Sequence, residues 1–382
     1  MTSVTKSILE QMYPNDRVII TAQLTLANGA FLQPTGFPDI GSCIYTDADG
    51  KKRCLVESEQ SMANRLEAVC IRAPGYWIDE LKQLPVVEVR DTNDALLATN
   101  VTEPHRIASS YVLQGKLNGS DVKDLLTTKL GLERGGSNWP LDKRDVLEKL
   151  VFALDPAALL HGFQFVQWDF VGLRQTRLLS ARLECVLAEE DPEVHYGMVK
   201  FDAIEPENTK EKKANKGQSI AAKSRIVPTR DGIQATFDID LLGLKNLALG
   251  DQEKKFLLAL TLWKIGAFLS NKPAFDARSR QTSPSLRLRA DCYLSCGVSV
   301  KWCAPPAEGN DVKISDLLDA LSNRSVDFDK LAGEQGFELQ KDDKDTRRFL
   351  RVTYARGASP QPTVPVPVPE ALQEGQPHPM ES

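Results

Sequence analysis

Residues 17–26 read RVIITAQLTL, and this stretch decides the first element of the fold. Apolar side chains occupy alternate positions, at Val18, Ile20, Ala22, Leu24 and Leu26. Most of the opposite positions are polar, at Arg17, Thr21, Gln23 and Thr25. A period of two residues is typical of a strand with one buried face, and Asn28-Gly29 favours a turn after it. We therefore predict a half-buried strand over residues 17–26.

A second stretch, RCLVESEQSMANRLEAVCI at residues 53–71, predicts a short strand over residues 53–56 and then a helix over residues 58–71 that is capped by Ser58. Helical spacing joins four apolar side chains into one stripe, at Met62, Leu66, Val69 and Cys70. The polar face near the helix start consists of Gln60, Ser61, Asn64 and Arg65. Such a face is explained by a binding site or by an ordinary solvated surface.

The remaining patterns predict strands and helices in a mixed order. We expect strands at residues 86–89, 163–171, 178–187, 293–302 and 348–355. We expect helices at residues 121–130, 142–160, 251–269 and 315–322, with Pro156 interrupting the second of them. Because a doubly wound sheet requires regular alternation of strands and helices, an α+β fold is favoured.

The composition is that of a globular protein, with 382 residues, 42% hydrophobic and 26% charged, and a formal charge of −5. These values exclude wholly disordered and fibrous classes. The first residues, MTSVTKSILEQMYPND, lack the apolar core of a secretory signal. The longest apolar run, residues 256–269, is too short to span a bilayer. A cytoplasmic protein that does not enter membranes is expected.

Motifs for metals, cofactors and catalysis are missing from the sequence. The seven cysteines include no C-x-x-C pair, and none of the four histidines lies at ligand spacing to another, so we expect reduced core thiols and neither metal nor cofactor. The glycine-rich stretch GLERGGS, residues 131–137, has no Gly-Lys-Ser/Thr ending. His105 is a lone candidate base. A binding or assembly protein is favoured over an enzyme.

Basic residues are concentrated in two segments. Residues 210–230 contain seven Lys or Arg and one Glu, and residues 272–289 contain five Lys or Arg and one Asp. We predict that both are mobile and contact a polyanion such as nucleic acid, although charge runs are commonly just solvated. The candidate contact residues are Lys212, Lys213, Lys216, Lys223, Arg225, Arg278 and Arg280.

The run LVESEQSMANRLEAV, residues 55–69, resembles the signature of a CRISPR-associated family, the backbone subunit of type I-G (formerly I-U) Cascade in the RAMP superfamily. Three further elements resemble the same family. They are Pro34, Gly36, Phe37 and Pro38; the Pro104-His105-Arg106 run; and RLRADCYL at residues 287–294.

The resemblance implies a ferredoxin-like core, similar to an RNA-recognition motif, with large insertions. One domain would then cover residues 1–357, with inserted loops at about residues 28–57 and 203–230. Residues 358–382 contain seven prolines, in runs such as PTVPVPVPE, and no Lys or Arg. This composition predicts a disordered tail.

The resemblance also implies a function in antiviral defence. Such subunits bind the spacer of a CRISPR RNA through its phosphate–ribose backbone, oligomerise along it and present it for recognition of target DNA. The implied partners are CRISPR RNA, target DNA, further copies of the chain, the large subunit and the guide-processing subunit of Cascade. Candidate RNA contacts are Gln60, Ser61, Asn64, Arg65, His105 and Arg106.

Two alternatives remain open at this point. An endoribonuclease of the same superfamily, acting on CRISPR or target RNA, would need a general base such as His105. A scaffold protein that binds no nucleic acid would recruit its partners through the proline-rich tail.

Overall fold

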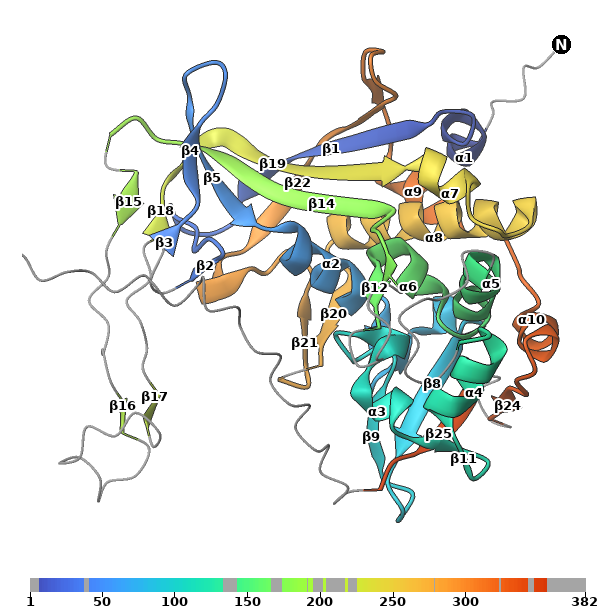
Figure 1. Cartoon of the computed structure of the whole chain (residues 1–382). Coiled ribbons are helices and arrows are strands. Elements are labelled where there is room, and N and C mark those ends of the chain that lie inside the picture. Colours follow the sequence, from blue (N-terminus) through green and yellow to red (C-terminus); the bar gives the residue numbers. More distant parts are fainter. Residues whose placement is uncertain are drawn as a thin grey trace, which may run out of the picture.

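The computed structural model describes residues 7–37, 41–132, 143–165, 174–190, 192–194, 202–203, 217–218, 225–277, 279–322, 324–342 and 347–355. Two β-sheets are separated by helices, with the larger sheet at the top of Figure 1 and the smaller sheet at the bottom. The expected α+β class is confirmed. Within the described residues, no helix has the length and hydrophobicity needed to cross a membrane.

The large sheet has seven strands in the order β23-β22-β1-β19-β14-β5-β4, and all neighbours are antiparallel. In that order the strands cover Asn310–Asp311, Leu294–Cys303, Arg17–Leu26, Pro228–Asp240, Leu179–Leu187, Lys52–Glu57 and Ile44–Thr46. The predicted strand over residues 17–26 is confirmed as β1. Its apolar face pairs with that of β19, where Ile20 lies opposite Phe237 and Ala22 opposite Ala235.

Two long helices pack on the buried face of this sheet. Helix α8 (Asp251–Leu269) follows the predicted bounds and is buried from Phe256 onward. Its Phe268 ring lies edge-on to Phe237 of β19, with 6.2 Å between ring centroids. Helix α2 (Glu59–Ala68) also matches its prediction and packs beside β14 and α8. Figure 1 shows both helices below the sheet, so they join its apolar face to the rest of the core.

The smaller sheet follows the order β11-β10-β25-β8-β9, with β24 also paired to β25. Strand β8 (Pro85–Arg90) runs parallel to β25 (Arg348–Thr353) at its centre. The other strands are β9 (Leu96–Thr99), β10 (Lys116–Leu117), β11 (Ser120–Asp121) and β24 (Gln340–Lys341). The predicted strands at 86–89 and 348–355 are thus confirmed.

Shorter helices fill the space around the two sheets. The predicted interruption at Pro156 is confirmed, because α5 (Arg144–Leu154) ends just before it and α6 (Pro156–His161) begins there. The remaining α-helices are α1 (Ile8–Met12), α3 (Ser110–Leu113), α4 (Val122–Lys129), α7 (Leu241–Lys245), α9 (Ile314–Asp319) and α10 (Phe328–Glu334).

Two-stranded pairs complete the fold. They are β2 (Gly36–Phe37) with β3 (Gly41–Ser42), β6 (Ile71–Arg72) with β7 (Tyr76–Trp77), β12 (Phe163–Gln164) with β13 (Arg174–Gln175), β15 (Glu193–Val194) with β18 (Arg225–Ile226), β16 (Asp202–Ala203) with β17 (Gly217–Gln218), and β20 (Pro273–Asp276) with β21 (Gln281–Pro284).

The prediction that residues 272–289 are mobile is wrong. Strands β20 and β21 form a hairpin in which Phe275 is buried, and Leu286 and Leu288 beyond it are buried as well. The Ser285 hydroxyl, also buried, donates to the carbonyl oxygen of Phe268 at 2.7 Å. Apolar residues interleaved with the arginines therefore anchor this segment to α8.

All seven cysteines are free thiols. Four of them, Cys54, Cys70, Cys185 and Cys292, are buried as predicted, whereas Cys43 is exposed. Burial raises the pKa of the Cys70 thiol to about 11, so this group stays protonated and apolar at neutral pH. The tail at 358–382 and most of the 203–230 loop lie outside the described residues.

Candidate nucleic-acid interface

Helix α2 presents the predicted polar face because its start and its apolar stripe are both fixed. The Ser58 hydroxyl accepts a hydrogen bond from the backbone N–H of Ser61, which caps the first turn. Met62 and Leu66 are fully buried. Asn64 is exposed on the other side, while Ser61 and Arg65 are half-buried.

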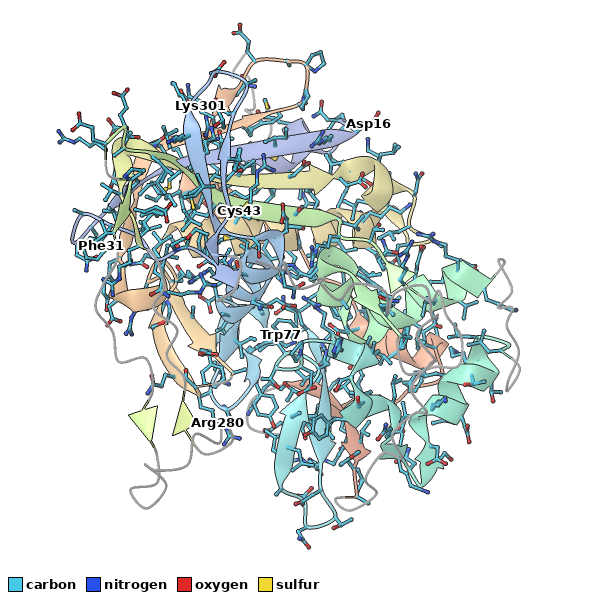
Figure 2. The ribbon with its side chains drawn as sticks, turned by 60° about the vertical axis from the view of Figure 1, so that its left-hand side comes forward. Asp16, Phe31, Cys43, Trp77, Arg280 and Lys301 are labelled. Carbon is cyan, nitrogen blue, oxygen red and sulfur yellow. The ribbon has the colours of Figure 1, made fainter. Side chains whose placement is uncertain are left out.

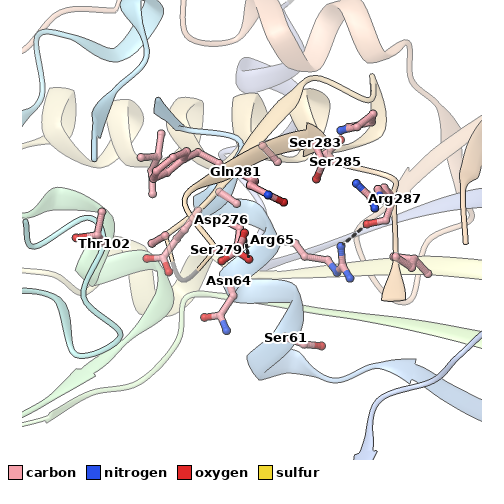
Figure 3. Close-up of a pocket in the computed structure, with 18 of the residues that line it drawn as sticks. Ser61, Asn64, Arg65, Thr102, Asp276, Ser279, Gln281, Ser283, Ser285 and Arg287 are labelled. Atoms are coloured by element: carbon pink, nitrogen blue, oxygen red, sulfur yellow. Dashed lines mark hydrogen bonds between the residues drawn. The ribbon is translucent and has the colours of Figure 1, made fainter. Parts of the chain in front are cut away.

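A cavity of about 730 Å³ lies beside this face. Its walls come from α2, the loop at 101–104, the β20–β21 hairpin and the segment at 287–291. Figure 3 shows Asn64 and Arg65 on one side, Gln281 and Ser283 on the hairpin, and Thr102 on a further wall. The fold therefore brings together three of the elements singled out in the sequence, at residues 55–69, 104–106 and 287–294.

A buried carboxylate fixes two arginines at one end of the cavity. Glu57, the last residue of β5, is completely buried. Its Oε1 accepts from Nε and Nη2 of Arg65 at 3.0 and 2.6 Å. Arg289 donates from Nη1 to Oε1 at 2.9 Å and from Nη2 to Oε2 at 3.0 Å. Two guanidinium groups thus share one carboxylate, so these three side chains together carry one net positive charge.

The pKa of Glu57 reflects this arrangement. Burial raises the pKa, but the charges of Arg65 and Arg289 outweigh burial and hold the pKa below its ordinary value. Arg65 also donates from Nη1 to the carbonyl oxygen of Arg287 at 3.0 Å, the contact dashed in Figure 3. These contacts use only part of the hydrogen-bonding capacity of each guanidinium, which carries five N–H donors.

Carboxylates that line the cavity are engaged by neighbouring side chains. Asp291 accepts from Nε of Arg287 at 3.0 Å, and Asp276 accepts from the Ser279 hydroxyl at 2.8 Å. By contrast, the carboxamides of Asn64 and Gln281 have no hydrogen-bond partner within the described residues. Both are exposed on walls of the cavity, so they can donate to and accept from a ligand.

The other candidate residues from the sequence lie in different settings. Gln60 is exposed, but its side-chain Oε1 accepts from Nη2 of Arg177 at 2.6 Å. His105 is exposed next to the cavity-lining Pro104, and Arg106 is buried.

The basic segments are only partly described. Figure 2 shows Arg280 exposed in the turn between β20 and β21. Arg225 lies over the ring of Phe31 with 4.9 Å to its centroid, and it does not line the cavity. The remaining candidates, Lys212, Lys213, Lys216, Lys223 and Arg278, lie outside the described residues.

Two residues at the cavity were not among the candidates. Arg289 belongs to the run at 287–294 and could have been selected from that motif, since it lies two positions after Arg287. Gln281 carries no motif that relates it to Arg65, and only the fold brings these two together. The buried partner Glu57 lies in the same run as Arg65, residues 55–69.

Part of the chain matches a known protein family. Residues 18–190 match the model of the family "CRISPR-associated protein GSU0053". The chain is similar to this CRISPR-associated family. The resemblance of residues 55–69 to a CRISPR-associated family is thereby confirmed. The matched residues include α2 and the loop at 101–106, whereas β20, β21 and the segment at 287–291 lie beyond them.

Solved structures show weaker similarity. The crystal structure of Thermofilum pendens Csc2 has 11% sequence identity and a TM-score of 0.28, covering 87% of this chain and 81% of that chain. A structure described as a CRISPR RNA-guided surveillance complex, pre-nicking, has 14% identity and a TM-score of 0.30, covering 70% of this chain and 74% of that chain. Similarities of this size do not establish a shared fold. No curated protein matches the sequence.

Proposed function

We propose that this chain is the backbone subunit of a type I-G CRISPR Cascade complex, in the RAMP superfamily, and that it binds the spacer of a CRISPR RNA through its phosphate–ribose backbone. The observation that carries the proposal is the cavity beside α2. Its walls combine the matched family region with polar side chains of the β20–β21 hairpin and a pair of arginines that share one carboxylate.

A ferredoxin-like core is part of the proposal. Strands β22, β1, β19 and β14 are adjacent in this order in the sheet. In the chain they follow the sequence β1-α2-β14-β19-α8-β22, apart from inserted elements. This is the β-α-β-β-α-β succession of a ferredoxin-like fold. Strand β5 extends the sheet beyond β14 and places Glu57 directly before α2.

The chemistry of the cavity suits an RNA backbone. The guanidinium N–H groups of Arg65 and Arg289 that do not donate to Glu57 are suited to phosphate oxygens, since guanidinium–phosphate hydrogen bonds are charge-assisted. The carboxamides of Asn64 and Gln281 are uncharged, and each can pair with a ribose 2′-hydroxyl, which both donates and accepts. Contacts of these two kinds hold an RNA strand whatever its sequence and leave base edges free for pairing.

Assembly follows from the same proposal. Copies of the chain would line up along one CRISPR RNA and present it to target DNA, together with the large subunit and the guide-processing subunit, in the cytoplasm. The lysine-rich segment at 210–223 and Arg280 would add contacts to the guide or target backbone. We propose a binding role and no catalytic one, so incubation with repeat RNA should leave the RNA intact.

Filter binding of RNA over a salt series tests the proposal. The double variant Asn64→Ala with Gln281→Ala should lower affinity about thirtyfold for unrelated RNA sequences, because it removes two hydrogen bonds of about 1 kcal/mol each. The salt slope should stay unchanged, because neither side chain neutralises a phosphate. Arg289→Gln should instead reduce the slope by about 0.7, because one phosphate is no longer neutralised.

The control is Lys330→Ala on α10, whose side chain is 71% exposed outside the cavity. This variant should bind RNA like the unchanged chain. If the cavity variants also bind RNA with unchanged affinity and slope, the cavity is not the RNA site. If the purified chain neither carries nor binds RNA, the proposed function fails.

A further inference from the structure

Arg106, a candidate RNA contact from the sequence, has an unusual environment. Its backbone φ is +53°, in the left-handed region that non-glycine residues rarely adopt. The residue is only 7% exposed. A large charged side chain held inside the protein on a strained backbone needs several fixed partners.

The guanidinium of Arg106 joins three parts of the fold. Its Nε donates to Oε1 of Glu67, on α2, at 2.6 Å. Its Nη1 lies within hydrogen-bonding reach of two carbonyl oxygens, that of Gly162 at 3.2 Å and that of Pro104 at 3.4 Å. The helix that lines the cavity, the loop at 102–108 and the turn after α6 are therefore tied together by one side chain.

The same loop is held from its other end. Asp155, at the junction of α5 and α6, accepts from the backbone N–H of Ile107 at 3.1 Å. The Arg106 N–H donates to the carbonyl oxygen of Glu103 at 2.9 Å. These bonds leave little freedom for Thr102, Glu103 and Pro104, which form a wall of the cavity.

The partner at Gly162 is also specific. Its φ is +77°, and a β-carbon there would lie 2.8 Å from the carbonyl oxygen of Gln175. A side chain at this position would therefore force the turn to move. The glycine allows the turn to pack closely while its carbonyl oxygen faces Arg106.

We propose that Arg106 is a positioning residue for the RNA site. It does not touch RNA; it fixes the loop at 102–105 against α2, so that the wall of the cavity and the neighbouring His105 keep their places. The effect on RNA binding rests on the proposed function. The clamp, meaning the contacts by which Arg106 holds this loop against α2, is tested without RNA.

Arg106→Lys is the decisive variant, because lysine keeps the charge for Glu67 but lacks the planar fork that reaches two carbonyl groups as well. Hydrogen exchange of the amides of Ile107 and Ala108 should become at least about fivefold faster than in the unchanged chain. RNA affinity should fall about fivefold to tenfold for all sequences, with an unchanged salt slope. Arg348→Lys is the matched control, since Arg348 pairs with Asp329 at 3.0 Å and does not line the cavity.

A fall of about 0.7 in the salt slope of Arg106→Lys would overturn the proposal, because it would mean that Arg106 itself neutralises a phosphate. Unchanged exchange at Ile107 and Ala108 would overturn it too. If the unchanged chain binds no RNA, the proposed function fails separately, and the exchange result alone decides whether the clamp exists. Should Arg106→Lys fail to fold, Glu67→Gln removes the partner charge instead and must give the same pattern.

Discussion

The buried carboxylate of Glu57 accepts two hydrogen bonds from the guanidinium of Arg65, at 3.0 and 2.6 Å. Glu57 is the last residue of β5, which lies next to the edge strand β4, and Arg65 lies on the helix that follows β5. The carboxylate therefore orients the guanidinium of Arg65 on the polar face of α2. Since Arg289 binds the same carboxylate from 232 residues further along the chain, this contact also ties the hairpin side of the cavity to the helix side.

Glu57→Gln should destabilise the protein by about 3 kcal/mol, because it leaves two guanidinium groups near each other without their buried counter-charge. Urea unfolding followed by circular dichroism measures this loss as a lower transition midpoint. Glu338→Gln, at an exposed position, should stay within about 0.5 kcal/mol. Equal stability of Glu57→Gln and the unchanged chain would mean that the ion pairs contribute no net stability.

The pH dependence of this effect has a definite sign. The pKa of Glu57 is lower in the folded state than its ordinary value of 4.5, so ionised Glu57 stabilises the fold above pH 4.5. That contribution is lost as pH falls through the folded-state pKa. The stability difference between the unchanged chain and Glu57→Gln should therefore be constant near neutrality and shrink below about pH 4.5. A difference that grows on acidification would contradict the ion-pair account.

Much of the fold follows from local sequence patterns. The alternation at 17–26 predicted β1, and the nearly uniform hydrophobicity of residues 256–269 predicted the buried helix α8. Strand β19 was missed, although Ile233, Ala235, Phe237 and Ile239 alternate, because Pro228, Gly232 and the preceding basic run resemble a loop. Its position at the centre of the sheet depends on pairing with β1 and β14, which no local pattern encodes.

The candidate site was predictable only on one side. The spacing of Ser61, Asn64 and Arg65 placed them on one helix face, since that depends on helical period alone. Their partners Glu57 and Arg289 could not be assigned in the same way, because β5 ends before the helix and Arg289 follows the hairpin far along the chain. Charge was also a misleading guide to residues 272–289. Five basic residues suggested a mobile segment, but the burial of Phe275 and Leu286 holds the segment in place.

Asp155 should show the opposite pH dependence to Glu57. Burial raises the pKa of its carboxyl to about 6, only partly offset by Asn100 and Arg106. The ordinary value is 3.8, so the folded state binds this proton more tightly and loses stability as pH rises from 3.8 to about 6. Relative to Asp155→Asn, the unchanged chain should gain about 2 kcal/mol on going from pH 7 to pH 4. Urea midpoints of both chains at these pH values measure this difference, and a constant difference would contradict it.

Phe275→Ala should loosen the hairpin wall. Phe275 is 4% exposed, and removal of a buried phenyl ring costs about 3 kcal/mol or more through weaker packing and a cavity. Thermal unfolding measures the loss, and RNA affinity should fall with an unchanged salt slope, since no charge is removed. Leu242→Ala is the control, because this side chain is 52% exposed and its removal should change stability by less than about 0.5 kcal/mol. If Phe275→Ala matches that control, the hairpin is not anchored by its apolar side chain.

The lysine-rich segment supplies the last prediction. Val194 pairs with Arg225 and Asp202 pairs with Gln218, and the four lysines replaced below lie between Val194 and Arg225 in the chain. Replacing Lys212, Lys213, Lys216 and Lys223 by Gln should lower RNA or target-DNA affinity and reduce the salt slope by up to about 3, at about 0.7 for each phosphate contact. A matched variant with Gln at Lys301, Lys313, Lys330 and Lys341 changes the net charge equally, at positions away from this segment. Equal slopes in the two variants would show that overall charge, and not this segment, attracts nucleic acid, and an unchanged slope in the first would make the segment a solvated surface.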